Sequence, residues 1–196
     1  MHRRRALACA AVALLPGVHG QAALAAELEG VRFEDSARVA GAELRLNGIG
    51  LRGAGWLKLY VAGLYLAAPA RTAREVLAQP GAKRVRMVMM HWAPTGEFVK
   101  ALEKGFQRNA SSEEWAALTE RLRQFSALVQ PLREVRKGDV IDLDFEPGRG
   151  MVFRFNGSVR GEPVAGVDFY AVLLRSFVGE HPYHKTLRAG MLGVGS

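Results

Sequence analysis

The chain has 196 residues, of which 27 are lysine or arginine and 19 are aspartate or glutamate, so its formal net charge is +8 at pH 7. The basic residues are spread among acidic and apolar ones without a dense patch or a recognition motif, so nucleic acids are not expected among its partners. The single cysteine, Cys9, excludes a disulfide within the chain.

The first 25 residues have the three parts of a secretory signal peptide. Three arginines at positions 3–5 precede an apolar run from Ala6 to Leu15, and Ala23-Leu24-Ala25 has the small-x-small pattern of a cleavage site. No segment reaches the roughly 18 apolar residues that a membrane-spanning helix needs. Residues 1–25 are therefore predicted to be a signal peptide, and the mature protein is expected in the periplasm or outside the cell, with no transmembrane segment and no thiol.

Strands dominate the first half of the remaining chain. Trp56 to Leu66 is apolar at both parities, which is typical of a strand covered on both faces, and its Gly63 leaves room for a close neighbour. A short amphipathic helix is predicted from Ala73 to Gln79, before Pro80-Gly81. The other predicted strands of this half are Leu28 to Asp35, Ala42 to Leu51 and Lys83 to Trp92.

Two helices are predicted next. The first follows Pro94-Thr95 and carries apolar residues at helical spacing. The second begins with Ser111-Ser112-Glu113-Glu114, which has the Ser-x-x-Glu form of a capping box, and it ends before Pro131.

The last third of the chain returns to strands and closes with helices. Val140 to Glu146 alternates, with Asp142, Asp144 and Glu146 on one side, which predicts a strand with one solvated face whose acids lie opposite Arg149 and Arg154. Asn156-Gly157 is the strongest hairpin signal in the chain. A helix apolar on two sides is predicted from Gly166 to Val178, and a short one from His184 to Leu192.

This order of elements favours the α+β class, with helices packed on an antiparallel sheet. No repeat, linker or low-complexity segment divides residues 26–196, so we predict a single domain there.

Arg52 stands between glycines just before the buried strand. A guanidinium is always charged, so it must contact an anion, a hydrogen-bond acceptor or water. The pattern by itself fits an exposed or salt-bridged arginine at a strand end, and it also fits an anion-binding group.

Two segments carry a family resemblance. The Gly-x-Gly-x-Arg-Gly motif at 48–53, with the strand that follows it, and Leu174-Arg175-Ser176-Phe177-Val178-Gly179-Glu180 resemble the chalcone isomerase and chalcone isomerase-like family. The resemblance implies an open-faced β-sandwich, in which a large antiparallel sheet carries a layer of helices and an apolar ligand cleft lies between them. It also implies that Arg52 holds the anion: a substrate oxygen in the isomerases, and a carboxylate in relatives that bind fatty acids.

The other polar positions of the isomerases are only partly kept. Their strand threonine falls on Tyr60, a proton-handling tyrosine on Phe98, an asparagine on Gly105 and a threonine on Ser176. Phenylalanine cannot transfer a proton, so the usual acid-base help is missing. The predicted ligand-binding residues are therefore Arg52, Tyr60, Phe98 and Ser176.

Three hypotheses follow. The first is a non-catalytic binding protein for a small apolar carboxylate such as a fatty acid. The second is an isomerase, an intramolecular lyase acting on a chalcone-like or enone substrate, with Arg52 as oxyanion stabiliser. The third is a periplasmic haem-binding or partner-protein module, in which His91, His181 or His184 would hold the haem. No metal site is predicted, because these histidines lack further ligands at useful spacing.

Overall fold

The computed structural model describes residues 24–194. Residues 1–23, and with them nearly all of the predicted signal peptide, lie outside the described part, so export remains a prediction. None of the helices between residues 24 and 194 is long and apolar enough to cross a membrane.

The main sheet has seven antiparallel strands in the order β11-β10-β9-β6-β5-β4-β3. Two small two-stranded sheets, β1-β2 and β7-β8, accompany it. The strands are β1 (Leu24–Leu28), β2 (Val31–Glu34), β3 (Ser36–Val39), β4 (Ala42–Ala54), β5 (Leu57–Leu66), β6 (Lys83–Met89), β7 (Ala93–Pro94), β8 (Glu134–Val135), β9 (Val140–Glu146), β10 (Gly150–Phe155) and β11 (Ser158–Val159).

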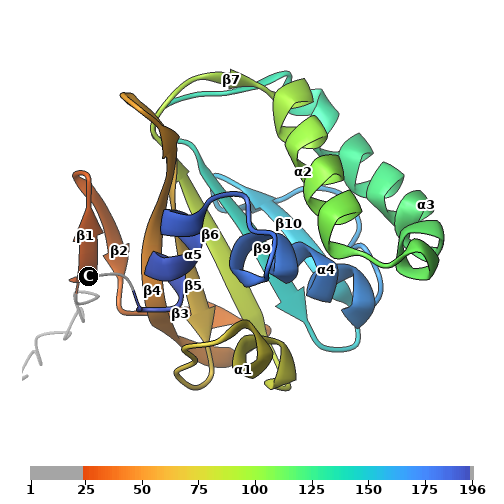
Figure 1. Cartoon of the computed structure of the whole chain (residues 1–196), viewed down its shortest axis with the longest axis horizontal. Helices are drawn as coiled ribbons and strands as arrows, with labels where there is room; N and C mark the ends of the chain where they lie inside the picture. The colour runs from red at the N-terminus through yellow and green to blue at the C-terminus, as the bar shows by residue number, and fades with distance from the viewer. Residues whose placement is uncertain (1–23, 195–196) are drawn as a thin grey trace, which may run out of the picture.

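Helices cover one face of this sheet, as Figure 1 shows. They are α1 (Ala73–Ala78), α2 (Thr95–Asn109), α3 (Ser112–Val129), α4 (Val167–Val178) and α5 (Lys185–Met191), with a short 3₁₀ helix, η1 (Gln130–Leu132), after α3. The predicted capping box is confirmed, because Ser111 and Glu114 each accept a hydrogen bond from the backbone amide of the other. The predicted α+β class, with a large antiparallel sheet and a helical layer, is confirmed.

Apolar residues cover both faces of β5, as its sequence predicted. Tyr60, Ala62 and Leu64 belong to the main core under the helices, and Val61 and Tyr65 belong to a second core on the other face. Phe33 of β2 lies over Gly63, where a β-carbon would be 2.8 Å from its ring.

The prediction of one strand from Leu28 to Asp35 is wrong. Glu29 and Gly30 have positive φ angles of 54° and 75° and form the turn of the β1-β2 hairpin. Two residues with positive φ are typical of the tightest hairpin turns, and glutamate is an unusual choice for one.

Helix α5 lies directly on β4, with backbone against backbone. A β-carbon on Gly50 would be 2.2 Å from the carbonyl oxygen of Leu187, and one on Gly48 would be 2.2 Å from that of Gly190. In the other direction, a β-carbon on Gly190 would be 2.2 Å from the carbonyl oxygen of Ile49. The helix can approach this closely only because these three residues have no side chain.

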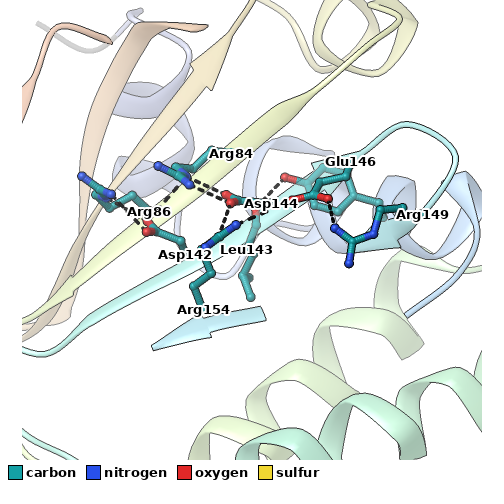
Figure 2. Close-up of polar contacts among 9 residues, drawn as sticks. Arg84, Arg86, Asp142, Leu143, Asp144, Glu146, Arg149 and Arg154 are labelled. Atoms are coloured by element: carbon teal, nitrogen blue, oxygen red, sulfur yellow. Dashed lines mark hydrogen bonds and ion pairs between the residues drawn. The ribbon is translucent and has the colours of Figure 1, made fainter. Parts of the chain in front are cut away.

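The predicted solvated face of β9 is wrong, because Asp142, Asp144 and Glu146 are buried, with exposed fractions of 2%, 1% and 5%. Arg84 and Arg86 of β6 lie opposite Asp144 and Asp142 in the sheet register. All three acids bind arginines in a group that we call the ionic cluster (Figure 2); its members are Arg84, Arg86, Asp142, Asp144, Glu146, Arg149 and Arg154.

The bonds within the ionic cluster are short and partly two-pronged. Arg84 donates to both oxygens of Asp144 at 2.6 Å, and Arg86 donates to both oxygens of Asp142 at 2.7 and 3.0 Å. Arg154 also binds Asp144, at 3.0 Å. The predicted placement of Arg149 and Arg154 opposite the acids is confirmed. The bidentate contacts join β6 to β9, and the single bond from Arg154 joins β10 to β9.

We expect Asp144→Asn to lower the free energy of unfolding by about 3–5 kcal/mol, because buried Arg84 loses its bidentate partner and keeps only the longer contact to Asp142, at 3.8 Å. Urea unfolding followed by circular dichroism measures this loss. Glu27→Gln is the matched control: its partner Arg32 is exposed, so the stability should stay nearly unchanged. A loss below about 1 kcal/mol for Asp144→Asn would contradict a stabilising role for the cluster.

Candidate functional site

A cavity of about 380 Å³ lies between α2 and the ends of β4, β5 and β6. This volume is in the range of small-molecule sites, about 300–1,000 Å³. Its apolar wall is built from Leu59, Met89, Ala93, Phe98, Ala101 and Val135. A narrow extension of about 10 Å³ reaches deeper, towards Leu143 and Phe177.

Arg52 lies on the wall of this cavity and is half-buried. Its Nη1 is 3.4 Å from the hydroxyl oxygen of Tyr60, which stands opposite it on β5. Its guanidinium carbon is 5.5 Å from the ring centre of Tyr60 and 5.0 Å from that of Tyr183. Aromatic rings thus hold the cation, and within residues 24–194 no carboxylate forms an ion pair with it.

The glycines before Arg52 explain its direction. Gly48, Gly50 and Arg52 lie opposite Leu64, Ala62 and Tyr60, so they share the helix-covered face of the sheet. Helix α5 occupies the space above the two glycines. Arg52 is the next residue on that face. It lies near the N-terminal end of α5, which Tyr183 precedes in the chain. The predicted arginine therefore points into the cavity.

Tyr60 is buried, and burial raises the pKa of its phenol, although Arg52 partly opposes this shift. At neutral pH the phenol therefore keeps its proton. A neutral hydroxyl beside a guanidinium can donate a hydrogen bond to an anion that Arg52 holds.

Tyr183 is a site residue that the sequence did not reveal. It lines the cavity from the loop between α4 and α5, and its ring meets Phe177 edge-on at 5.1 Å. It rests on Gly105 of α2, where a β-carbon would be 2.6 Å from its ring and its hydroxyl. Glycine inside a helix costs about 1 kcal/mol relative to alanine, so Gly105 was the available signal of a close neighbour.

Of the two other predicted ligand-binding residues, one lines the cavity and one does not. Phe98 lines the cavity together with Arg52 and Tyr60. Ser176 does not: it is fully buried in α4, where its hydroxyl donates to the carbonyl of Val172 at 3.1 Å. Its backbone carbonyl accepts from the amide of Tyr183, and a side-chain hydrogen bond between Ser176 and Tyr183 partly opposes the rise that burial causes in the pKa of that phenol, so Ser176 reaches the site only through Tyr183. Its part in ligand binding stays a prediction.

The described histidines His91, His181 and His184 are absent from the cavity wall. His184 instead lies 2.7 Å from the hydroxyl of Thr186. Within residues 24–194 no three metal-binding side chains come together.

The model of the chalcone isomerase-like family matches residues 25–193. The chain belongs to this family. The likeness predicted from the Gly-x-Gly-x-Arg-Gly motif and from the C-terminal helix is thereby confirmed.

A solved structure from a plant has a similar fold. The crystal structure of a fatty-acid binding protein from Arabidopsis thaliana superposes with a TM-score of 0.62 at 18% sequence identity, covering 83% of this chain and 92% of that one. Among curated proteins there is no match.

All four tyrosines of this chalcone isomerase-like domain should resist ionisation. Burial raises the pKa of Tyr65 to about 12, and it also raises those of Tyr60, Tyr170 and Tyr183. Unfolded tyrosine titrates near pH 10. We therefore expect the folded protein to show much less tyrosinate absorbance at 295 nm at pH 10 than the urea-unfolded protein, which should be about half ionised.

The same shifts set the sign of the alkaline stability change. Between pH 10 and the higher pKa values of the folded state, only the unfolded chain releases these protons, so stability must fall as pH rises. The expected slope is about 1.4 kcal/mol per pH unit for each tyrosine. A native titration centred at pH 10 would show that these phenols reach water.

Proposed function

We propose that this protein is exported and binds a small apolar carboxylate, such as a fatty acid, with its head group on Arg52 and its chain along the apolar wall beneath α2. The observation that carries the proposal is a half-buried guanidinium, without an acidic partner in residues 24–194, on the wall of an apolar cavity of about 380 Å³. A cation in a partly dry site binds an anion more strongly than it does in water.

Two further features support binding of a carboxylate. Tyr60 keeps its proton and stands beside Arg52, so a carboxylate there would accept from both groups. The fold is also that of a plant fatty-acid binding protein. The basic and apolar segments at the N-terminus are the support for export.

An isomerase, with Arg52 stabilising an oxyanion, remains the second candidate. Tyr183 favours it, since this phenol lies beside Arg52 and can donate a proton, which Phe98 at the position of the isomerase tyrosine cannot do. Burial raises the pKa values of Tyr183 and Tyr60, so neither phenol is a good base at neutral pH. The site thus holds a cation and two weak acids, which suits binding of an anion better than proton abstraction.

Arg52→Gln should weaken binding of decanoate at least tenfold, because a hydrogen bond to a charged group contributes about 1.5–3 kcal/mol. Titration calorimetry of the mature protein measures the change. Decanol is the matched ligand control: it has the same chain without the charge, so its affinity should change less than about threefold.

Equal decanoate affinity of the wild type and Arg52→Gln would contradict the proposed head-group site. Failure of the wild type to bind decanoate or decanol would contradict the binding function itself. Ring closure of an enone substrate by the wild type, lost in Arg52→Gln, would instead establish the isomerase.

A further inference from the structure

The cavity has a second set of cations on the side of α2. Lys100, Lys104 and Arg108 all line it, and their spacing of four residues puts them on one face of the helix. All three are exposed at its opening. Like charges at this spacing repel each other.

Acidic residues neutralise little of this charge. Glu97 is the single acidic residue of the cavity wall, and it already accepts a hydrogen bond from Lys100 at 2.8 Å. Within residues 24–194, neither Lys104 nor Arg108 forms an ion pair. Arg52, Lys104 and Arg108 therefore face one cavity as three cations without acidic partners.

Tyr183 links Arg52 to the two cations on α2. One side of the phenol lies 5.0 Å from the guanidinium carbon of Arg52, and another side rests on Gly105. Lys104 directly precedes Gly105, and Arg108 follows it by one helical turn. Asn109 holds this region together, because its side-chain amide donates to the carbonyls of both Gly105 and His181 at 2.9 Å.

We propose, on the basis of the proposed function, that this anion site prefers a doubly charged head over a carboxylate: a phosphate monoester on an apolar chain. A monocarboxylate has one negative charge and needs one cation. A phosphate has three terminal oxygens and about two charges, so it can use more than one of the cations that line this cavity. Alkyl phosphates and monoacyl glycerol phosphates share this chemistry.

The test compares three ligands with the same chain: decyl phosphate, decyl sulfate and decanoate, each below its micellar concentration, by titration calorimetry at pH 7.5. The sulfate matches the tetrahedral shape of the phosphate with a single charge. We expect decyl phosphate to bind at least tenfold more tightly than the other two. Monodecanoyl glycerol phosphate in a parallel titration distinguishes the two sources: tighter binding than decyl phosphate indicates a lipid head group, and equal binding a simple phosphate ester.

The double variant Lys104→Gln/Arg108→Gln should lose about tenfold in affinity for decyl phosphate and less than threefold for decanoate. Arg123→Gln on α3 is the matched control, since it removes an exposed charge away from the cavity and should change neither affinity.

Three results would overturn the inference. Equal binding of all three ligands would contradict the doubly charged head group but not the proposed function. An unchanged affinity of the double variant for decyl phosphate would do the same. If inorganic phosphate binds as tightly as decyl phosphate, the alkyl chain contributes nothing to the affinity. If decanoate also fails to bind, the proposed function fails as well.

Discussion

The contact between the backbones of β4 and α5 determines where the site forms. Gly48 and Gly50 let the helix lie directly on the strand, and Gly190 does the same on the side of the helix. Arg52 then emerges on the same face, where the helix no longer covers the strand. A side chain at either strand glycine would lift α5 and, with it, the preceding loop that carries Tyr183. The glycines of the motif are thus a packing requirement, and the arginine depends on them for its direction.

The two faces of the sheet separate structural charge from binding charge. On the face away from the helices, each buried acid binds at least one arginine, so the ionic cluster leaves no acid without a cation and ties the strands together (Figure 2). On the helix face, the cations around the cavity have few acidic partners in the described residues. Unmatched charge beside an apolar wall is what an amphiphilic anion needs, so the proposed binding rests on where acids are absent among the described residues.

Local sequence patterns predicted the helices and strands well, but they did not show which distant residues pack against them. The period of two in β9 and the Ser-x-x-Glu of α3 each depend on nearby residues, so the sequence was sufficient for them. The burial of Asp142 and Asp144 depends on arginines about sixty positions away, and alternation along β9 cannot show that pairing. Tyr183 escaped notice for the same reason, because it enters the site from a loop. Arg52 was found through the family resemblance that its Gly-x-Gly-x-Arg-Gly motif carries, because the pattern alone also fitted a salt-bridged arginine at a strand end.

The most direct test of this account is a crystal structure of the mature protein with decanoate bound. The account predicts the carboxylate within about 3 Å of the guanidinium of Arg52. It also predicts that the alkyl chain of decanoate lies beneath α2 against Phe98, and that α5 still packs on Gly48 and Gly50. Decanoate bound elsewhere, or an Arg52 that pairs with a carboxylate of its own chain and leaves the cavity, would contradict it.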